Sequence, residues 1–369
     1  MKKMMFFEIK KLYDKKLLVV FVVLLFFNMV HIISESSEVR SDSYRGKRLI
    51  INNVEGKITQ DKVDFLLDGF NKNSALVAAG EYDTEERDPN TYTGYVFGDM
   101  NMFNEIYTDL KRVYEYSEDM EIRIKILDEN IERDPGVSSE AHFIKSDIGD
   151  RAITSYFDTT GIQKYFDYSD SILFILIMHI LVLGNYLFYD RSHDMEAMIH
   201  TTQNGRSNLR MSRYITSMGF VVLSTLTILI MDLILFSLLY KIKGLANPIY
   251  SLTAFNLTFM NLPIYTYVIL QIVIKLLVSM FLGTLMINIV DKFRNKYLSV
   301  LFSFGLSFGT WLILFRSTSP LSIQRLSQFF SNLFVASVYI QKLHILVASI
   351  FLLFFILSLS YLKRGKKVR

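Results

Sequence analysis

Four polar residues lie inside long apolar stretches of this 369-residue chain, where ionisable groups are rare. They are His179, Asp232, Gln271 and Lys275, and three different stretches carry them. Counted at ~1.5 Å per helical residue from the ends that face the same side, the first three lie ~12 Å deep and Lys275 lies ~18 Å deep. Similar depths on different helices predict a polar cluster that faces the interior of a helical bundle.

Asp232 and Lys275 carry opposite charge, so an ion pair between them would lower the cost of burying either residue alone. Buried polar groups of this kind are typical of a path for a polar substrate through a membrane. Two interpretations stay open. The four residues line a translocation pathway, or they only support helix packing while Lys275 extends toward the membrane surface.

Motifs for nucleotide binding and covalent catalysis are absent. The chain has no G-x-x-x-x-G-K-[ST] loop, no H-E-x-x-H, no G-x-S-x-G and no cysteine. The six histidines are scattered, and the pair His193 and His200 is only a weak candidate for a metal site. We therefore expect no catalytic, cofactor-binding or metal-binding site and no enzyme activity in this chain.

Six apolar stretches approach or exceed the ~20 residues that a helix needs to cross a ~30 Å hydrocarbon core. The predicted spans are residues 17–34, 171–189, 214–240, 263–290, 298–316 and 343–362. A hydrophobic content of 51% is high for a soluble globular protein. The first span is too long for a cleavable signal peptide and is expected to remain as an anchor.

The loops between the spans differ strongly in positive charge. Eighteen Lys and Arg residues lie in segments 1–16, 190–213, 291–297 and 363–369, against four in loops 241–262 and 317–342. The positive-inside rule therefore predicts a multi-pass protein of the cell membrane with both termini in the cytoplasm and residues 35–170 outside. The cations flank spans in several short segments, so they are expected to attract anionic membrane lipids and not nucleic acid.

The segment 35–170 has 29 acidic and 16 basic residues and the size of an ordinary domain. Its acidic surface is either only solvated or attracts cationic ligands such as basic peptides. Helical spacing is seen in three apolar sets: Val63, Leu66, Leu67 and Phe70 after a Thr59 cap; Phe103, Ile106, Leu110 and Val113; and Phe143, Ile144 and Ile148 after Ser138 or Ser139. The alternation of Ile122, Ile124 and Ile126 predicts a strand, and Asp88-Pro89-Asn90 and Asp134-Pro135-Gly136 predict turns.

Together these patterns predict an all-α polytopic membrane bundle of six transmembrane helices with an inserted α-rich α+β extracellular domain. Residues 1–16 precede the first span, and Met5, Phe6, Ile9, Leu12 and Tyr13 recur there at helical spacing between lysines. That pattern favours an amphipathic helix in the membrane interface, although a disordered basic leader stays possible. A five-helix region, residues 171–362, follows the extracellular domain, and residues 363–369 form a basic cytoplasmic tail.

The first cytoplasmic loop, residues 190–213, contains a short helix pattern. Asp194 can cap it, Met195, Met198 and Ile199 form an apolar face, and Asn204-Gly205 can end it. A loop of this length cannot bury that apolar face on itself. The short helix is therefore expected to contact the membrane surface or a partner protein.

This loop resembles the corresponding loop in permease subunits of type-2 ABC exporters, especially those of Gram-positive type. The resemblance assigns ATPase coupling to Asp190, Met195, Glu196, Met198, Ile199, Thr201, Thr202, Gly205 and Arg206, with Arg213 as the closing base. Asp190 replaces the more common Glu, and Asp194 occupies the usual Gly position. In that family this segment is the coupling helix, which sits in a groove of the cytoplasmic ATPase.

The resemblance implies a permease subunit that works with a separate cytoplasmic ABC ATPase, which binds the ATP. A second permease subunit would complete the pathway, as a homodimer or a heterodimer. The expected substrate is amphipathic: a peptide, an antibiotic or a lipid-like molecule. Two other functions stay open, namely a membrane-anchored extracellular recognition or immunity protein without transport activity and a polytopic enzyme that acts on lipid-linked substrates.

The charge asymmetry predicts the topology of the chain in intact cells. Protease added outside should cleave within residues 35–170, whereas epitope tags at either terminus should stay protected until the membrane is permeabilised. Immunoblotting before and after permeabilisation measures both. Labelling of a terminal tag in intact cells would show that the orientation is wrong.

Overall fold

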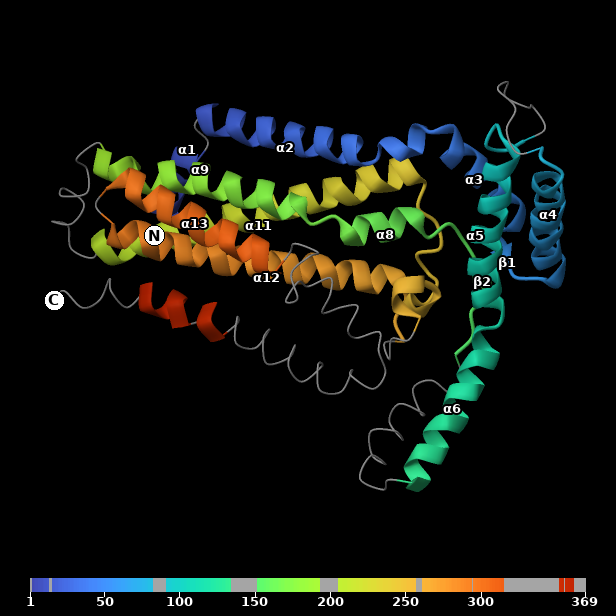
Figure 1. The fold of residues 1–369 in the computed structure, drawn as a ribbon. Coiled ribbons are helices and arrows are strands. Elements are labelled where there is room, and N and C mark those ends of the chain that lie inside the picture. The colour runs from blue at the N-terminus through green and yellow to red at the C-terminus, as the bar shows by residue number, and fades with distance from the viewer. Residues whose placement is uncertain are drawn as a thin grey trace.

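The computed structural model describes residues 2–12, 15–81, 91–133, 151–192, 205–256, 261–293, 295–314, 352–354 and 356–361. These residues form a mostly helical protein in which the long helices run side by side (Figure 1). Five of the described helices are long and apolar enough to cross a membrane. The chain is therefore a multi-pass membrane protein.

The five helices correspond to the first five predicted spans. They are α2 (Lys15–Glu35), α9 (Asp170–Ser192), α11 (Gly205–Tyr240), α12 (Ile264–Lys292) and α13 (Lys296–Leu314). α11 begins at Gly205 and not at residue 214, because Leu209, Ser212 and Arg213 are already buried against the bundle. The sixth predicted span lies largely outside the described residues, and its residues 352–354 and 356–361 are helical.

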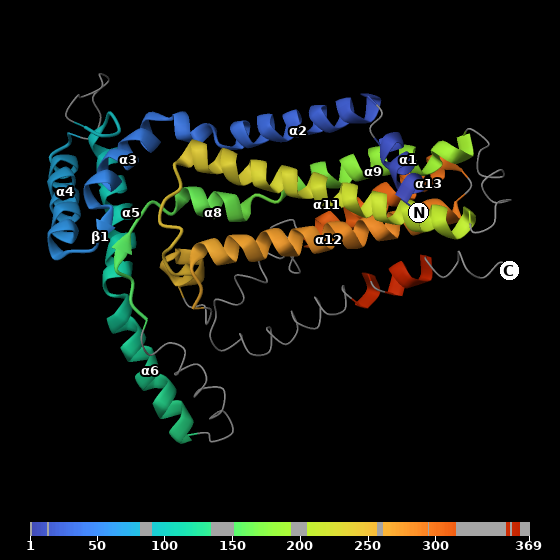
Figure 2. The same cartoon turned by 180° about the vertical axis from the view of Figure 1, so that it is seen from behind.

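α9 is the central helix of the bundle and packs against α2, α11, α12 and α13. The most apolar 18-residue window within Thr160–Tyr189, which covers most of α9, is 72% buried, against 17% for the corresponding window of α2. Ile172, Ile175 and Met178 on α9 are fully buried. α2 lies along one edge of the bundle in both views (Figures 1 and 2), so most of its surface is available to lipid.

The amino-terminal helix α1 (Lys2–Leu12) confirms the helix predicted from the leader. It packs against α11 and α9. Glu8 is fully buried there, where its carboxylate accepts hydrogen bonds of 2.6 Å from the Tyr186 hydroxyl and from Lys11 Nζ. The bond from Tyr186 attaches α1 to α9, whereas the bond from Lys11 lies within α1. The position of α1 in the membrane interface stays a prediction.

Between α2 and α9 the chain forms a group of shorter elements. They are η1 (Ser37–Arg40), α3 (Asp42–Val54), β1 (Gly56–Lys57), α4 (Gln60–Ala78), α5 (Val96–Tyr114), α6 (Tyr116–Arg133), β2 (Ser155–Tyr156) and α8 (Thr160–Asp167). α3, α4 and α5 share an apolar core in which Ile50, Val54, Leu66, Ile106 and Leu110 are at most 1% exposed. Figure 1 shows these helices beyond one end of the long bundle.

The helices predicted around Leu66 and Ile106 are confirmed as α4 and α5. The predicted strand at residues 122–126 is wrong, because those residues belong to α6. Good helix formers separate the isoleucines, and Ile122 and Ile126 are about half exposed, one helical turn apart. The helix predicted after Ser138 or Ser139 and both predicted turns lie outside the described residues.

In the described residues the sheet consists of β1 and β2, which pair antiparallel with Gly56 opposite Tyr156. β2 leads into α8, which packs on the carboxyl-terminal end of α11. A Cβ atom at Gly161 would lie 2.4 Å from Tyr240 Cβ, so only glycine permits this close approach. Buried aromatic residues of α8, α11 and α12, among them Tyr165, Phe236 and Tyr267, fill the space around it.

Leu110→Ala should lower the stability of the α3–α5 core by about 2–5 kcal/mol, because it leaves a cavity at a fully buried site. The measurement is the melting temperature of the detergent-solubilised chain, together with the rate of protease cleavage in the outer segment. Ile126→Ala is the matched control, since that side chain is 50% exposed. Equal losses for the two variants would contradict the placement of Leu110 in a core.

Candidate functional site

A series of hydrogen bonds crosses the interior of the bundle. Asn28 Nδ2 on α2 donates to Asp232 Oδ1 on α11 at 2.6 Å. The Tyr168 hydroxyl donates to Asn28 Oδ1 at 2.8 Å, and Lys275 Nζ on α12 donates to the Tyr168 carbonyl at 3.3 Å. All four residues are buried. We call Asn28, Tyr168, Asp232 and Lys275 the polar chain.

The polar chain corrects the predicted ion pair between Asp232 and Lys275, which do not contact each other directly. Asn28 and Tyr168 come between them from other parts of the bundle. Lys275 Nζ instead donates to the carbonyl of Tyr168, the residue that follows the last residue of α8, and lies 5.8 Å from the centre of the Tyr165 ring.

The second oxygen of the Asp232 carboxylate lies outside the polar chain. This Oδ2 atom and the Ser171 hydroxyl are both buried and have no other hydrogen-bond partner among the described residues, and Ser171 is within reach to donate to the carboxylate. Buried polar atoms are normally satisfied by protein or water. The Ser171 hydroxyl can therefore serve this oxygen, and a water molecule or a polar group of a substrate would compete with it.

Gln271 and His179 lie outside the polar chain. Gln271 Nε2 donates to the Tyr267 hydroxyl one turn along α12, at 2.8 Å. His179 Nε2 is 3.0 Å from the Ser224 hydroxyl on α11. Ser224 is eight residues from Asp232, which corresponds to ~12 Å along the helix. The predicted single cluster is therefore wrong for His179, which forms a separate buried contact nearer the α1 end of the bundle.

Sequence reasoning missed two members of the polar chain. Asn28 is a lone amide in the apolar stretch of α2, and a single amide in such a stretch indicates a hydrogen bond to another helix. Tyr168 lies at the end of α8, outside the predicted spans, and its role depends on the way α8 packs on α11. No local pattern could identify it.

Most of the predicted ATPase-coupling residues cannot be placed. Met195, Glu196, Met198, Ile199, Thr201 and Thr202 lie outside the described residues, as do His193 and His200. Asp190 belongs to the last turns of α9, and Gly205 and Arg206 are the first residues of α11. Gly205 was expected to end a short helix, but it begins α11.

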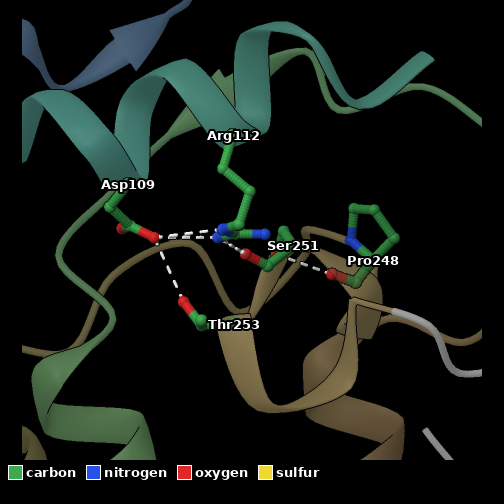
Figure 3. Close-up of polar contacts among 5 residues, drawn as sticks. All are labelled: Asp109, Arg112, Pro248, Ser251 and Thr253. Carbon is green, nitrogen blue, oxygen red and sulfur yellow. Dashed lines mark hydrogen bonds and ion pairs between the residues drawn. The ribbon is translucent and has the colours of Figure 1, made fainter. Parts of the chain in front are cut away.

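At the other end of the bundle, α5 is bound to the loop between α11 and α12. Arg112 donates to Asp109 at 2.9 Å and to the Ser251 carbonyl at 3.0 Å (Figure 3). Thr253 donates to the same Asp109 oxygen at 3.1 Å, and the Ser251 hydroxyl donates to the Pro248 carbonyl. η3 (Ile249–Ser251) and η4 (Thr253–Phe255) carry these loop residues.

Further contacts strengthen this attachment, which we call the outer clamp. The Tyr116 ring stacks on Tyr250 with centroids 5.2 Å apart, and the Tyr116 hydroxyl donates to the Asn256 carbonyl at 3.2 Å. Burial raises the pKa of Tyr116, so its hydroxyl stays a donor at neutral pH. Lys243 pairs with Glu55. The outer clamp therefore combines apolar, polar and ionic contacts between segments far apart in the chain.

The described residues contain no group of three or more His, Cys, Asp or Glu side chains that could hold a metal ion. The comparisons with known proteins also provide no assignment. No protein-family model, curated protein or solved structure matches the chain.

Asn28→Leu should lower the melting temperature of the detergent-solubilised chain, because it leaves Asp232 Oδ1 and the Tyr168 hydroxyl buried without partners. The expected cost is about 1–3 kcal/mol. Asp232→Leu together with Asn28→Leu should cost less than the sum of the two single changes, since both remove the same bond.

The matched control for this prediction is Asn53→Leu, which changes an exposed asparagine on α3 whose amide donates to the Leu49 carbonyl of the same helix. It should leave the melting temperature nearly unchanged. Strict additivity of the Asn28 and Asp232 variants would mean that the two residues act independently.

Proposed function

We propose that this chain is the transmembrane permease subunit of an ATP-driven ABC exporter. In this proposal six helices cross the cell membrane, both termini are cytoplasmic, and residues 35–170 form an extracellular domain. A separate cytoplasmic ATPase binds to the loop at 190–213, and a second permease subunit, identical or related, completes the pathway. The substrate is amphipathic: a peptide, an antibiotic or a lipid-like molecule.

The observation that carries the proposal is the length and continuity of α11. Its 36 residues extend over ~54 Å, whereas the hydrocarbon core is ~30 Å thick. It begins at Gly205, directly after the predicted coupling segment. Its last residue, Tyr240, accepts a hydrogen bond from Arg48 and donates one to Glu38. One rigid element thus connects the ATPase-facing loop with the outer segment.

α12 supports the same interpretation, because it is joined to α11 at both ends. Arg210 on α11 and Asp291 on α12 form a partly buried ion pair at 3.8 Å near the ends that the proposal places in the cytoplasm. At the opposite ends the loop between the two helices belongs to the outer clamp. A displacement of α11 by the ATPase would therefore move α12 and the outer clamp with it.

The polar chain offers a place where such a displacement could open a pathway. α2 contributes only three buried residues, Leu17, Asn28 and Ile32. A shift of α11 relative to α2 would break the Asn28–Asp232 bond and free the Asp232 Oδ1 acceptor. A polar part of the substrate could then replace the lost partner.

Met198→Ala combined with Ile199→Ala should weaken binding of the ATPase, because these side chains are proposed to fill its apolar groove. Truncation of interface anchors typically costs on the order of 1–3 kcal/mol each. The measurement is co-purification with a co-expressed candidate ABC ATPase from the same organism, followed by ATP hydrolysis by the complex. Leu298→Ala combined with Leu301→Ala, on an exposed face of α13, is the control.

The double variant should keep normal membrane expression and melting temperature while it loses the partner. The chain alone should not hydrolyse ATP. Unchanged association of the Met198 and Ile199 variant would contradict the coupling assignment. A wild-type chain that binds no ATPase at all would favour the membrane-anchored recognition protein instead.

A further inference from the structure

A cavity of about 430 Å³ lies between α1, α2 and α11. α1 contributes Met5 and Ile9, α2 contributes Leu18, and α11 contributes Gly219 and Leu223. Leu18 is 54% exposed and Leu223 is 67% exposed, so the cavity opens at the surface of the bundle. Its volume is within the range of pockets that hold small-molecule ligands.

The lining selects for an apolar occupant. Most of the residues are aliphatic or aromatic, and two of the three hydroxyl groups are already satisfied, since Ser224 donates to the Phe220 carbonyl and Thr227 to the Leu223 carbonyl. The third, Thr216, has a buried hydroxyl without a partner among the described residues. The walls come from the first two turns of α2 and from residues 215–227 of α11, which lie beside those turns. In a membrane the cavity would therefore lie in the leaflet on the α1 side of the bundle.

The surroundings of the cavity are positively charged. Residues 1–16 carry six lysines against two acidic residues, and one of these acids, Glu8, is buried in the bundle. Lys10 follows the lining residue Ile9, and Lys15 lies one helical turn before Leu18 on the same side of α2. Both lysines are exposed, and neither has an ion-pair partner among the described residues.

We propose that this cavity binds one anionic phospholipid of the surrounding membrane. One acyl chain fills the space between α1, α2 and α11, and the phosphate group contacts Lys10 and Lys15. In a membrane, the apolar surface exposed at the mouth faces lipid, so an acyl chain can enter from the side. The negative headgroup is favoured by the lysines, as for other basic segments at membrane surfaces. The proposal is independent of the exporter assignment.

The bound lipid would connect the leader helix to the first span. α1 is held by Glu8 on one side, while its Met5 and Ile9 face the cavity. A resident acyl chain would therefore complete the packing between α1 and α2, which the described side chains leave open.

The test uses the full chain and counts bound phospholipids by native mass spectrometry after reconstitution with phosphatidylglycerol or phosphatidylcholine of identical acyl chains. Wild type should retain one phosphatidylglycerol with a clear preference over phosphatidylcholine. Lys10→Gln combined with Lys15→Gln should lower that preference about fivefold per lysine. Lys72→Gln, on α4 in the outer segment, is the control for the loss of positive charge.

The cavity is tested by Gly219→Leu. A Cβ atom at Gly219 meets no atom within 4 Å, so the new side chain can extend into open space. The retained lipid should be lost. Gly305→Leu on α13 is the matched control, because a Cβ atom there also meets no atom within 4 Å. If Gly219→Leu lowers the melting temperature, Gly219→Ala should still reduce lipid retention without that loss.

Retention of phosphatidylglycerol by Gly219→Leu at the wild-type level would overturn the proposal. Equal binding of the two phospholipids by wild type would also overturn it. A third contradicting result is a change from dimer to monomer in Gly219→Leu without loss of lipid, because the cavity would then hold a second copy of the chain.

Discussion

The hydrogen bond between Asn28 and Asp232 is the contact on which the arrangement of the bundle depends. Most of α2 faces outward, and Asn28 is one of its three buried residues. In hydrocarbon a polar side chain without a partner is unfavourable, so the amide gives α2 one preferred rotation and one preferred depth. Tyr168 then joins the same amide to the end of α8 and, through its carbonyl, to Lys275.

The outer clamp and the polar chain both hold α11 and α12. The outer clamp binds the loop that joins the two helices, and the polar chain binds them inside the bundle. Arg48 and Glu38 bind the last residue of α11, and Arg112 and Tyr116 bind the loop that follows it. The segment between α2 and α9 is thus attached to the bundle by these side-chain contacts as well as by its covalent links to α2 and α9. A rotation of that segment alone would break several bonds at once, whereas a joint movement with α11 would preserve them.

The apolar helices could be predicted from the sequence, and the connections among them could not. Length and hydropathy alone located α2, α9, α11, α12 and α13, because a membrane leaves few other structures for such stretches. The helical spacing of the apolar residues around Leu66 and of those around Ile106 likewise predicted α4 and α5.

The errors have physical causes that local patterns do not contain. The alternation of Ile122 and Ile126 suggested a strand, but no partner strand exists for it in the described residues and the intervening residues favour helix. Asp232 and Lys275 were both identified, yet their partners were not. Asn28 is separated from Asp232 by 204 positions and Tyr168 from Asn28 by 140, so only the fold brings them together.

The same separations impose an order on biosynthesis. Asn28 enters the membrane with α2, before the ribosome has synthesised Tyr168 and Asp232. At about 5–20 residues per second, translation of the 204 intervening positions takes about 10–40 s. Tyr168 is synthesised after 140 of these positions, so the amide lacks Asp232 for the whole interval and Tyr168 for the first part of it. The strongly apolar composition of the rest of α2 keeps the helix inserted until the ribosome delivers α11.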